Sequence, residues 1–193
     1  MRQIQLIGPV DKRVIAYPLF RICDTIGKVL VITDDANFRR FSDDYSNEFT
    51  VGNSDFYVCN DISKSIALEL GIRLSSYDYV IIINTNELFP NNDCTVYCHA
   101  QSELICTEDV IDDIDTVEHM EIVISTSKPK EKIESFCSIT SNNLDYVWSC
   151  EENKYFLPCK NAELGKISAF LFAQVLGLNS KDEYAQILAK DLR

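Results

Sequence analysis

The loop that begins at Gly8 lies where α/β proteins often bind phosphate, and Lys12 within it and Asp34 after the next apolar run are charged residues, but the loop lacks most of the groups that phosphate binding normally uses. A glycine lets backbone N–H groups close around phosphate oxygens. Phosphate chemistry also depends on positioned charge and metal, which a lysine and an aspartate can supply. Gly8 follows a short apolar segment, in the place where α/β proteins often bind phosphate. The first question is therefore which elements position these groups.

The spacing of apolar side chains predicts those elements. Ile4–Ile7 is a short apolar strand, and Val14–Thr25 has the spacing of a helix. Gly27 is expected to close that helix as its C′ residue. Val29–Ile32 is a continuous apolar run, which is typical of a strand buried in a parallel sheet. The segments together predict a βαβ unit.

The segment Gly8–Val14 resembles the GGVGKTT loop of the ParA/MinD family of deviant Walker A ATPases. The interval from Lys12 to Asp34 matches the interval in that family between the P-loop lysine and the aspartate that ends its second strand. Three later segments are similar to the GKxVLxI, YDxVIIDT and VVxTxP runs of the family: Gly27–Ile32, Tyr77–Thr85 and Ile122–Pro129. The matches occur in order over roughly the first two thirds of the chain, and each is weakly specific alone.

Four positions depart from the family's motif, and each loses a group that nucleotide chemistry needs. Pro9 has no N–H to donate, and Asp11 places a carboxylate, which repels phosphate, where the family has a glycine. Arg13 replaces the hydroxyl residue that would hold Mg²⁺, and Asn84 stands at the second acidic position. We therefore predict a pseudo-ATPase with no catalytic residue, no cofactor and no metal ion. The vestiges of the nucleotide site are Gly8, Lys12 and Asp34.

Pro18 bears on where the first helix begins. Proline is tolerated near a helix start, where its missing N–H needs no partner. The helix is therefore expected to begin at about Val14 or Ile15, later than a P-loop helix that opens at its lysine. Such a start would draw the helix N-terminus away from the phosphate position.

The rest of the chain continues to alternate strands and helices, which favours a parallel sheet. Phe38–Phe41 is expected to be a short surface segment, and Gly52-Asn53 a hairpin turn. Asn60 or Asp61 is expected to cap the next helix. Further strands are predicted at Val80–Ile83, Thr95–His99, Ile122–Ser125, Tyr146–Trp148 and Tyr155–Leu157.

These elements predict a single α/β domain covering residues 1–193. The expected architecture has three layers, with a mostly parallel sheet and helices on both faces, as in P-loop NTPase-like or Rossmann-like folds. Ile4–Ile7 and Val80–Ile83 are expected at the centre of the sheet. Val29–Ile32 and Ile122–Ser125 are expected to flank them.

Charge and composition limit the partners of the protein. Eighteen basic and thirty acidic side chains give a net charge of −12, which argues against direct binding of nucleic acid and favours a protein partner. No segment is long and apolar enough to span a membrane, and the amino terminus has no signal-peptide pattern. We therefore expect a cytoplasmic protein whose eight cysteines are free thiols.

Cys94, Cys98, His99 and Cys106 could in principle hold zinc. Their spacing is not that of a standard zinc knuckle, and Cys98 and His99 would point to opposite faces of a strand. Buried thiols are the favoured interpretation.

The segment Ala162–Leu178 is apolar nearly all round and predicts either a buried helix or a contact between subunits. On the second interpretation, the protein is a homo-oligomer, and a dimer is expected. The candidate contact residues are Ile167, Phe170, Leu171, Phe172 and Val175.

The functional expectation is a non-enzymatic scaffold or adaptor. The ParA/MinD resemblance implies a role in positioning or assembling a cellular machine, of the segregation, pilus, secretion or division type. A first alternative is a degenerate receiver-like or small-ligand-binding regulatory domain, because Lys28–Asp35 and Lys128-Pro129 resemble parts of response-regulator receivers. A second alternative is an ATPase that binds nucleotide weakly.

Overall fold

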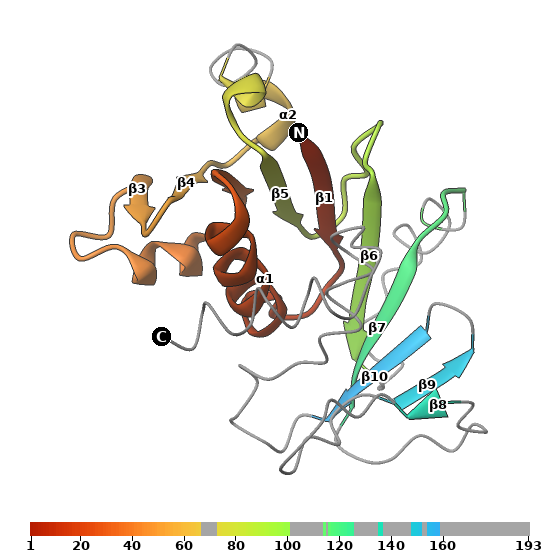
Figure 1. Ribbon diagram of the computed structural model, residues 1–193. Helices are drawn as coiled ribbons and strands as arrows, with labels where there is room; N and C mark the ends of the chain where they lie inside the picture. Colours follow the sequence, from red (N-terminus) through yellow and green to blue (C-terminus); the bar gives the residue numbers. More distant parts are fainter. Residues whose placement is uncertain are drawn as a thin grey trace.

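A mixed β-sheet organises the part of the chain that the structure describes (Figure 1). The computed structural model describes residues 1–66, 73–100, 114, 116–125, 135–136, 148–151 and 154–158 of the 193 residues. Within these ranges, ten strands form one sheet in the order β3-β4-β2-β5-β1-β6-β7-β10-β9-β8. Neighbouring strands from β4 to β10 in that order are parallel, whereas β3, β9 and β8 pair in antiparallel fashion. The predicted α/β class with a mostly parallel sheet is confirmed at this level.

The strand bounds are β1 Arg2–Ile7, β2 Val29–Thr33, β3 Glu48–Val51, β4 Ser54–Val58, β5 Tyr79–Asn84, β6 Cys94–Ala100, β7 Met120–Ser125, β8 Ser135–Phe136, β9 Trp148–Glu151 and β10 Lys154–Pro158. The described helices are α1 Arg13–Ile26 and α2 Ile62–Ser65, with short 3₁₀ segments η1 Ala36–Phe41 and η3 Leu74–Ser76. None of them is long and apolar enough to cross a membrane.

The centre of the sheet agrees with the prediction in part. β1 lies beside β5, and β2 lies on the other side of β5, as expected. The expectation that residues 122–125 lie directly beside β1 is wrong, because β6 separates β1 from β7. β6 can occupy this position because its side chains are buried on both faces, including Val96, Tyr97 and Cys98.

Helix α1 begins earlier than predicted. Its first residue is Arg13, directly after Lys12, and Pro18 lies inside it. The expectation that Pro18 delays the helix start to Val14 or Ile15 is therefore wrong. The carboxylate of Asp11 accepts a hydrogen bond from the backbone N–H of Arg13 at 3.0 Å, which satisfies a free donor at this earlier start. Lys12 lies at the N-cap, directly before the first helical residue, so the helix starts one residue before the expected Val14.

Gly27 ends α1, as predicted, but for a different reason. Its φ of −174° is extended backbone and not the left-handed conformation of a C′ glycine. A Cβ atom at this position would lie 2.7 Å from the Cβ of Asp78. The backbone N–H of the next residue, Lys28, donates to the Asp78 carboxylate at 2.8 Å. Close approach to Asp78 therefore requires the glycine.

Two apolar clusters cover opposite faces of the central strands. The first contains the α1 residues Ile15, Leu19 and Phe20 with the strand residues Ile4, Leu6, Val29, Val31, Ile81 and Ile83. The second contains Ile62 of α2 and Tyr77 with Leu30, Ile32, Val80 and Ile82. The burial of both faces explains why the central strands are continuous apolar runs.

Several local predictions are confirmed. β3 and β4 form the expected hairpin, with Gly52 at φ +64° in the turn. Asp61 caps α2 by accepting from the backbone N–H of Lys64 at 2.8 Å. β10 contains the predicted strand Tyr155–Leu157 and pairs in antiparallel fashion with β9, which begins at Trp148. The expected surface segment at 38–41 needs correction, because Phe38 is fully buried in the α1-side cluster.

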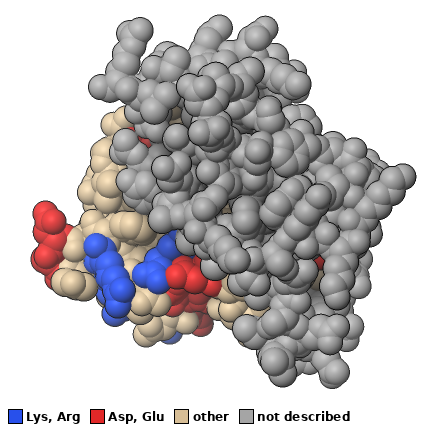
Figure 2. All heavy atoms as spheres, turned by 90° about the horizontal axis from the view of Figure 1, so that it is seen from below, with Lys and Arg blue, Asp and Glu red and all other residues tan. Residues whose placement is uncertain are grey.

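The predicted helix with Ile167, Phe170, Leu171, Phe172 and Val175 lies outside the described residues, as does Cys106. The described part of the underside carries basic and acidic side chains next to one another (Figure 2).

Candidate functional site

The loop from residue 8 to residue 12 leaves the carboxyl end of β1 and enters α1. Gly8 has a φ of +133°, and a Cβ atom there would lie 2.0 Å from the carbonyl oxygen of Cys98 on β6. The backbone N–H of Gly8 donates to the Asn84 carbonyl at 3.3 Å. Gly8 is therefore required by a close backbone approach between β1 and β6, independently of any ligand.

Lys12 turns inward, onto its own loop. Its side chain donates hydrogen bonds through Nζ to the carbonyl oxygens of Gly8 at 2.5 Å and Val10 at 3.0 Å. The residue is only 5% exposed. Burial lowers the pKa of Lys12, and the nearby carboxylates of Asp34 and Asp35 oppose that shift. The loop thus directs two carbonyl oxygens at an internal cation, whereas a phosphate cradle directs N–H groups at an anion.

Asp11 occupies the N-terminus of α1. Its Oδ1 accepts from the backbone N–H of Arg13 at 3.0 Å and from Arg13 Nε at 2.9 Å, and its Oδ2 accepts from Nη2 at 2.5 Å. These bonds with the guanidinium lower the pKa of Asp11 and raise that of Arg13. A helix N-terminus favours an anion. Here the chain supplies that anion itself.

Asp34 and Asp35 face the same loop from the end of β2. An open hollow of about 630 Å³ is lined by both aspartates and by residues of the loop, including Lys12. Partial burial raises the pKa of Asp34, while the Lys12 ammonium and the backbone N–H of Thr85 favour its charged form. Asp35 caps η1 by accepting from Asn37 N at 2.9 Å and Nδ2 at 2.8 Å. The lining residues are Pro9, Val10, Asp11, Lys12, Asp34, Asp35, Ala36, Asn37, Asn60 and Thr85.

Asn84 is held on the other face of the sheet. It is 1% exposed, accepts from Gln5 Nε2 at 2.8 Å and donates to the Glu87 carbonyl at 2.5 Å. Gln5 Nε2 also donates to that carbonyl at 2.6 Å, while Gln5 Oε1 accepts from Phe89 N at 3.1 Å and Asn92 Nδ2 at 2.7 Å. Both polar atoms of the buried Gln5 amide are therefore used.

This network has a clear role in the fold. The connection from β5 to β6 must cross β1, because β1 lies between them. A loop that crosses a sheet needs partners for its backbone polar groups, and Gln5 provides them from within the apolar segment Ile4–Ile7 of β1. Asn84 thus anchors the crossing loop and does not line the hollow.

The predicted site residues are therefore brought together in part. Pro9, Asp11, Lys12 and Asp34 share one hollow, whereas Gly8 packs against β6 and Asn84 joins the Gln5 network. Sequence analysis missed Gln5 and the lining residues Asn60 and Thr85. A lone glutamine within the apolar segment Ile4–Ile7 was the available signal for the first of these.

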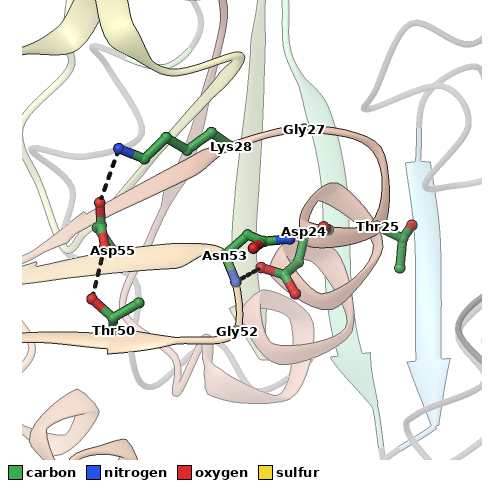
Figure 3. Close-up of a pocket in the computed structure, with 8 residues that line it drawn as sticks. All are labelled: Asp24, Thr25, Gly27, Lys28, Thr50, Gly52, Asn53 and Asp55. Carbon is green, nitrogen blue, oxygen red and sulfur yellow. Dashed lines mark hydrogen bonds and ion pairs between the residues drawn. The ribbon is translucent and has the colours of Figure 1, made fainter.

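A second hollow, of about 550 Å³, lies at the opposite, amino-terminal edge of the sheet (Figure 3). Asp55 accepts from Thr50 Oγ1 at 2.8 Å, and Lys28 Nζ lies 3.6 Å from Asp55 Oδ2. Asp24 accepts from the backbone N–H of Asn53 at 2.6 Å. The two carboxylates therefore tie the β3–β4 hairpin to β2 and to the end of α1.

Both histidines of the chain lie near Tyr97. The ring of His99 stacks on Tyr97 at a centroid distance of 5.1 Å, and His99 Nε2 lies 2.5 Å from Glu121 Oε1. The ring of His119 meets Tyr97 edge to face at 6.4 Å. Cys98 instead faces the α1-side cluster, so the expected division between Cys98 and His99 is confirmed.

The cysteines that the structure describes with their side chains are free thiols: Cys23, Cys59, Cys94 and Cys98. Burial raises the pKa of Cys94 to about 11 and that of Cys98 to about 12, so neither is activated as a nucleophile. Among the described residues, no group of three or more His, Cys, Asp or Glu side chains is placed to hold a metal ion.

The loop between β1 and α1 therefore lies at the carboxyl end of a parallel strand, and its lysine and the helix N-terminus after it both have bonding partners within the chain. The lysine is bonded to loop carbonyls, and the helix N-terminus is bonded to Asp11. No known family model matches this chain, and no curated protein matches it.

Proposed function

We propose that this protein is a non-catalytic, ParA/MinD-like pseudo-ATPase that acts as a scaffold or adaptor in the cytoplasm. The observation that carries the proposal is that the chain's own groups already bond to the lysine and to the helix N-terminus of this site. Lys12 bonds to the carbonyls of Gly8 and Val10, and Asp11 takes the anion position at α1. A nucleotide phosphate would have to displace both interactions and meet the carboxylates of Asp34 and Asp35.

The proposal includes a three-layer domain, with helices from the rest of the chain covering both faces of the sheet. Apolar clusters on both faces of the central strands support this arrangement. The net charge of −12 supports a protein partner over nucleic acid. A scaffold of this kind would position or assemble a cellular machine through its surface, and its self-association would be constitutive because no nucleotide drives it.

Calorimetric titration with Mg-ATP and Mg-GTP tests the proposal. We expect no saturable heat for the wild-type protein and none for Lys12→Ala. Saturable binding at micromolar concentration that Lys12→Ala abolishes would contradict the proposal and favour a weak nucleotide-binding ATPase.

A matched variant tests the physical reason. Asp11→Gly removes the carboxylate that occupies the helix N-terminus and exposes the N–H of Arg13. We expect this variant to bind inorganic phosphate more tightly than the wild-type protein does. Equal affinities would show that Asp11 is not what closes the site.

The open hollow of about 630 Å³ favours one second candidate, a small-ligand-binding or receiver-like regulatory domain. It lies outside the carboxyl ends of parallel strands, where such ligands bind. Saturable protection of the domain against thermal unfolding by a small cationic or neutral metabolite, in a screen, would favour this candidate.

A further inference from the structure

The segment from Arg39 to Tyr45 carries both signs of charge beside one exposed ring. Arg39 and Arg40 form the last turn of η1, and Asp43 and Asp44 follow them as exposed residues. Tyr45 is 67% exposed and has a φ of +57°. Tyrosine and arginine are the residue types that dominate the energy of protein contacts.

Two phenylalanines, Phe38 and Phe41, pack the start of the segment against the rest of the domain. Phe38 is fully buried, and its ring meets Phe41 at 5.7 Å. Phe41 in turn contacts Phe20 of α1 at 6.0 Å and Phe56 of β4 at 6.1 Å. This aromatic cluster fixes the turn that presents the two arginines. A contact surface that is already ordered loses little entropy on binding.

The loop that follows is fixed by Ser42. The hydroxyl of Ser42 donates to Asp44 Oδ1 at 2.5 Å and accepts from the backbone N–H of Ser46 at 3.4 Å. The same N–H lies 3.2 Å from Asp44 Oδ1. These bonds flank Tyr45, which is in a left-handed conformation that a tyrosine rarely adopts and is largely exposed.

The charges of this segment are not neutralised within the described residues. None of the described ion pairs involves Arg39, Arg40 or Asp43. Arg40 is exposed, whereas Arg39 is half-buried with its Nε enclosed, so only the outer part of the Arg39 guanidinium is offered to a partner. The arginines and the aspartates lie a few residues apart, so a two-fold axis through the segment would place each pair opposite the other pair of a second copy.

We propose that the 39–45 segment is a self-complementary contact between two copies of this chain. In this contact Arg39 and Arg40 face Asp43 and Asp44 of the second copy, and Tyr45 packs at the centre. The proposal rests on the proposed scaffold function, in which self-association is constitutive. Charge complementarity favours a second copy, because the segment matches itself, whereas a purely acidic or basic patch would require a different partner.

The overall charge of −12 works against this contact at a distance. At an ionic strength of about 0.15 M, however, repulsion beyond about 8 Å is largely screened, whereas pairs in direct contact are screened less. The contact is small and belongs to the weak, transient class. Its dissociation should therefore be followed over a wide dilution series.

Sedimentation equilibrium at about 0.15 M salt tests the contact through charge reversal. Arg39→Glu/Arg40→Glu alone, and Asp43→Lys/Asp44→Lys alone, should each weaken the dimer at least about tenfold. An equimolar mixture of the two variants should restore wild-type affinity, because each reversed pair then meets its opposite. Lys64→Glu/Arg73→Glu is the matched control for the arginine variant, since it lowers the net charge by the same amount at exposed positions elsewhere.

Two further measurements keep the test independent of folding in the reversed variants. The wild-type dimer should weaken as salt is raised from about 0.15 to about 0.5 M. Tyr45→Asn, which tolerates the left-handed backbone, should weaken the dimer while preserving the circular dichroism spectrum. A monomeric wild-type protein, a salt-insensitive dimer, or a mixture of variants that stays monomeric would overturn the proposal. The nucleotide titration is separate, so a monomer that binds no nucleotide would overturn this contact and leave the pseudo-ATPase proposal standing.

Discussion

At the scale of single residues, the charged side chains of the candidate site are bonded to other groups of the same loop and helix. The ammonium of Lys12 bonds to carbonyls of the same loop, and Asp11 bonds to the first turn of the helix that follows. A loop can therefore contain a lysine and a glycine at this spacing and still direct its carbonyl oxygens, and not its N–H groups, toward the lysine. The direction in which the lysine points decides the chemistry, and residue spacing does not encode it.

Gln5 offers a test of the buried polar network. Gln5→Leu keeps the side-chain volume but leaves Phe89 N and the Asn84 amide oxygen without this partner. Because unsatisfied buried polar groups are costly, we expect the free energy of unfolding to fall by about 3 kcal/mol. Urea denaturation measures this loss.

The control for that experiment is Gln3→Leu. Gln3 also bonds to the crossing loop, through Nε2 to Asn92 Oδ1 at 2.8 Å, but it is only part-buried. We expect a loss of less than about 1 kcal/mol. Equal losses for the two variants would show that the network around Gln5 adds no special stability.

The Asp11–Arg13 pair gives a pH-dependent prediction. The folded-state pKa of Asp11 lies below its ordinary value of 3.8. The pair therefore contributes stability above pH 3.8, and this contribution is lost as the pH falls through the folded-state pKa. Because the pair is substantially exposed, a double-mutant cycle with Asp11→Asn and Arg13→Gln should give a coupling of about 0.5 kcal/mol at neutral pH. The coupling should vanish in strong acid, and a coupling that persists there would contradict the assignment.

At the scale of elements, the glycines mark where backbones approach closely. Gly8 faces a backbone carbonyl that cannot move without shifting β6, whereas Gly27 faces the side chain of Asp78. The two positions therefore differ in how much the neighbour can yield.

This difference predicts a ranking of two alanine variants. Gly8→Ala, at φ +133° and 2.0 Å from the Cys98 carbonyl, should reduce the free energy of unfolding by about 4 kcal/mol or prevent folding. Gly27→Ala has an extended backbone and a side-chain neighbour, so we expect a loss of about 1 to 2 kcal/mol. Thermal unfolding of both variants measures the ranking, and the reverse order would refute this account of the β1–β6 contact.

Local elements could be predicted from the sequence because their signals are local. The apolar spacing of 14–25 predicts α1 to within a residue or two, and Gly52-Asn53 predicts the β3–β4 turn. The place of β6 between β1 and β7 could not be predicted in this way, because strand order depends on contacts between distant segments. The same holds for Gln5, whose partners lie 79 to 87 residues away.

The candidate site was predictable to a similar degree. The carboxyl ends of parallel strands share one edge, so Lys12 and Asp34 were expected to meet, and they line one hollow. The bond between Asp11 and the N–H of Arg13 was missed because Pro18 suggested a later helix start. Asp11, which precedes the N-cap residue Lys12, accepts from the first N–H of the helix, while Pro18 lies inside the helix.

At the scale of the whole molecule, two surfaces are proposed for self-association. The apolar segment Ala162–Leu178 predicts one of them from sequence and lies outside the described residues. The 39–45 segment is the other. Because the first is apolar and the second is charged, salt separates their contributions.

Phe170→Asp and Phe172→Asp test the apolar surface. If this helix forms a subunit contact, each variant should remain folded and should dissociate the assembly in a light-scattering dilution series. Loss of folding in both variants, together with a wild-type monomer at high concentration, would show that the helix is buried in the core of a single subunit.

The position of β1 has a consequence for how the chain folds as it is made. β1 pairs with β5 and β6, so Ile4 lies beside Ile81 on one side and Cys94 on the other. β1 leaves the ribosome before β5 and β6, so both its edges are covered only after β6, which ends at Ala100, has also emerged. Until then the backbone N–H and C=O groups along its edges are unpaired, and a nascent-chain stage of this kind is where chaperones act. We infer that stalling translation before β6 would leave β1 exposed to protease, whereas release beyond β6 would protect it.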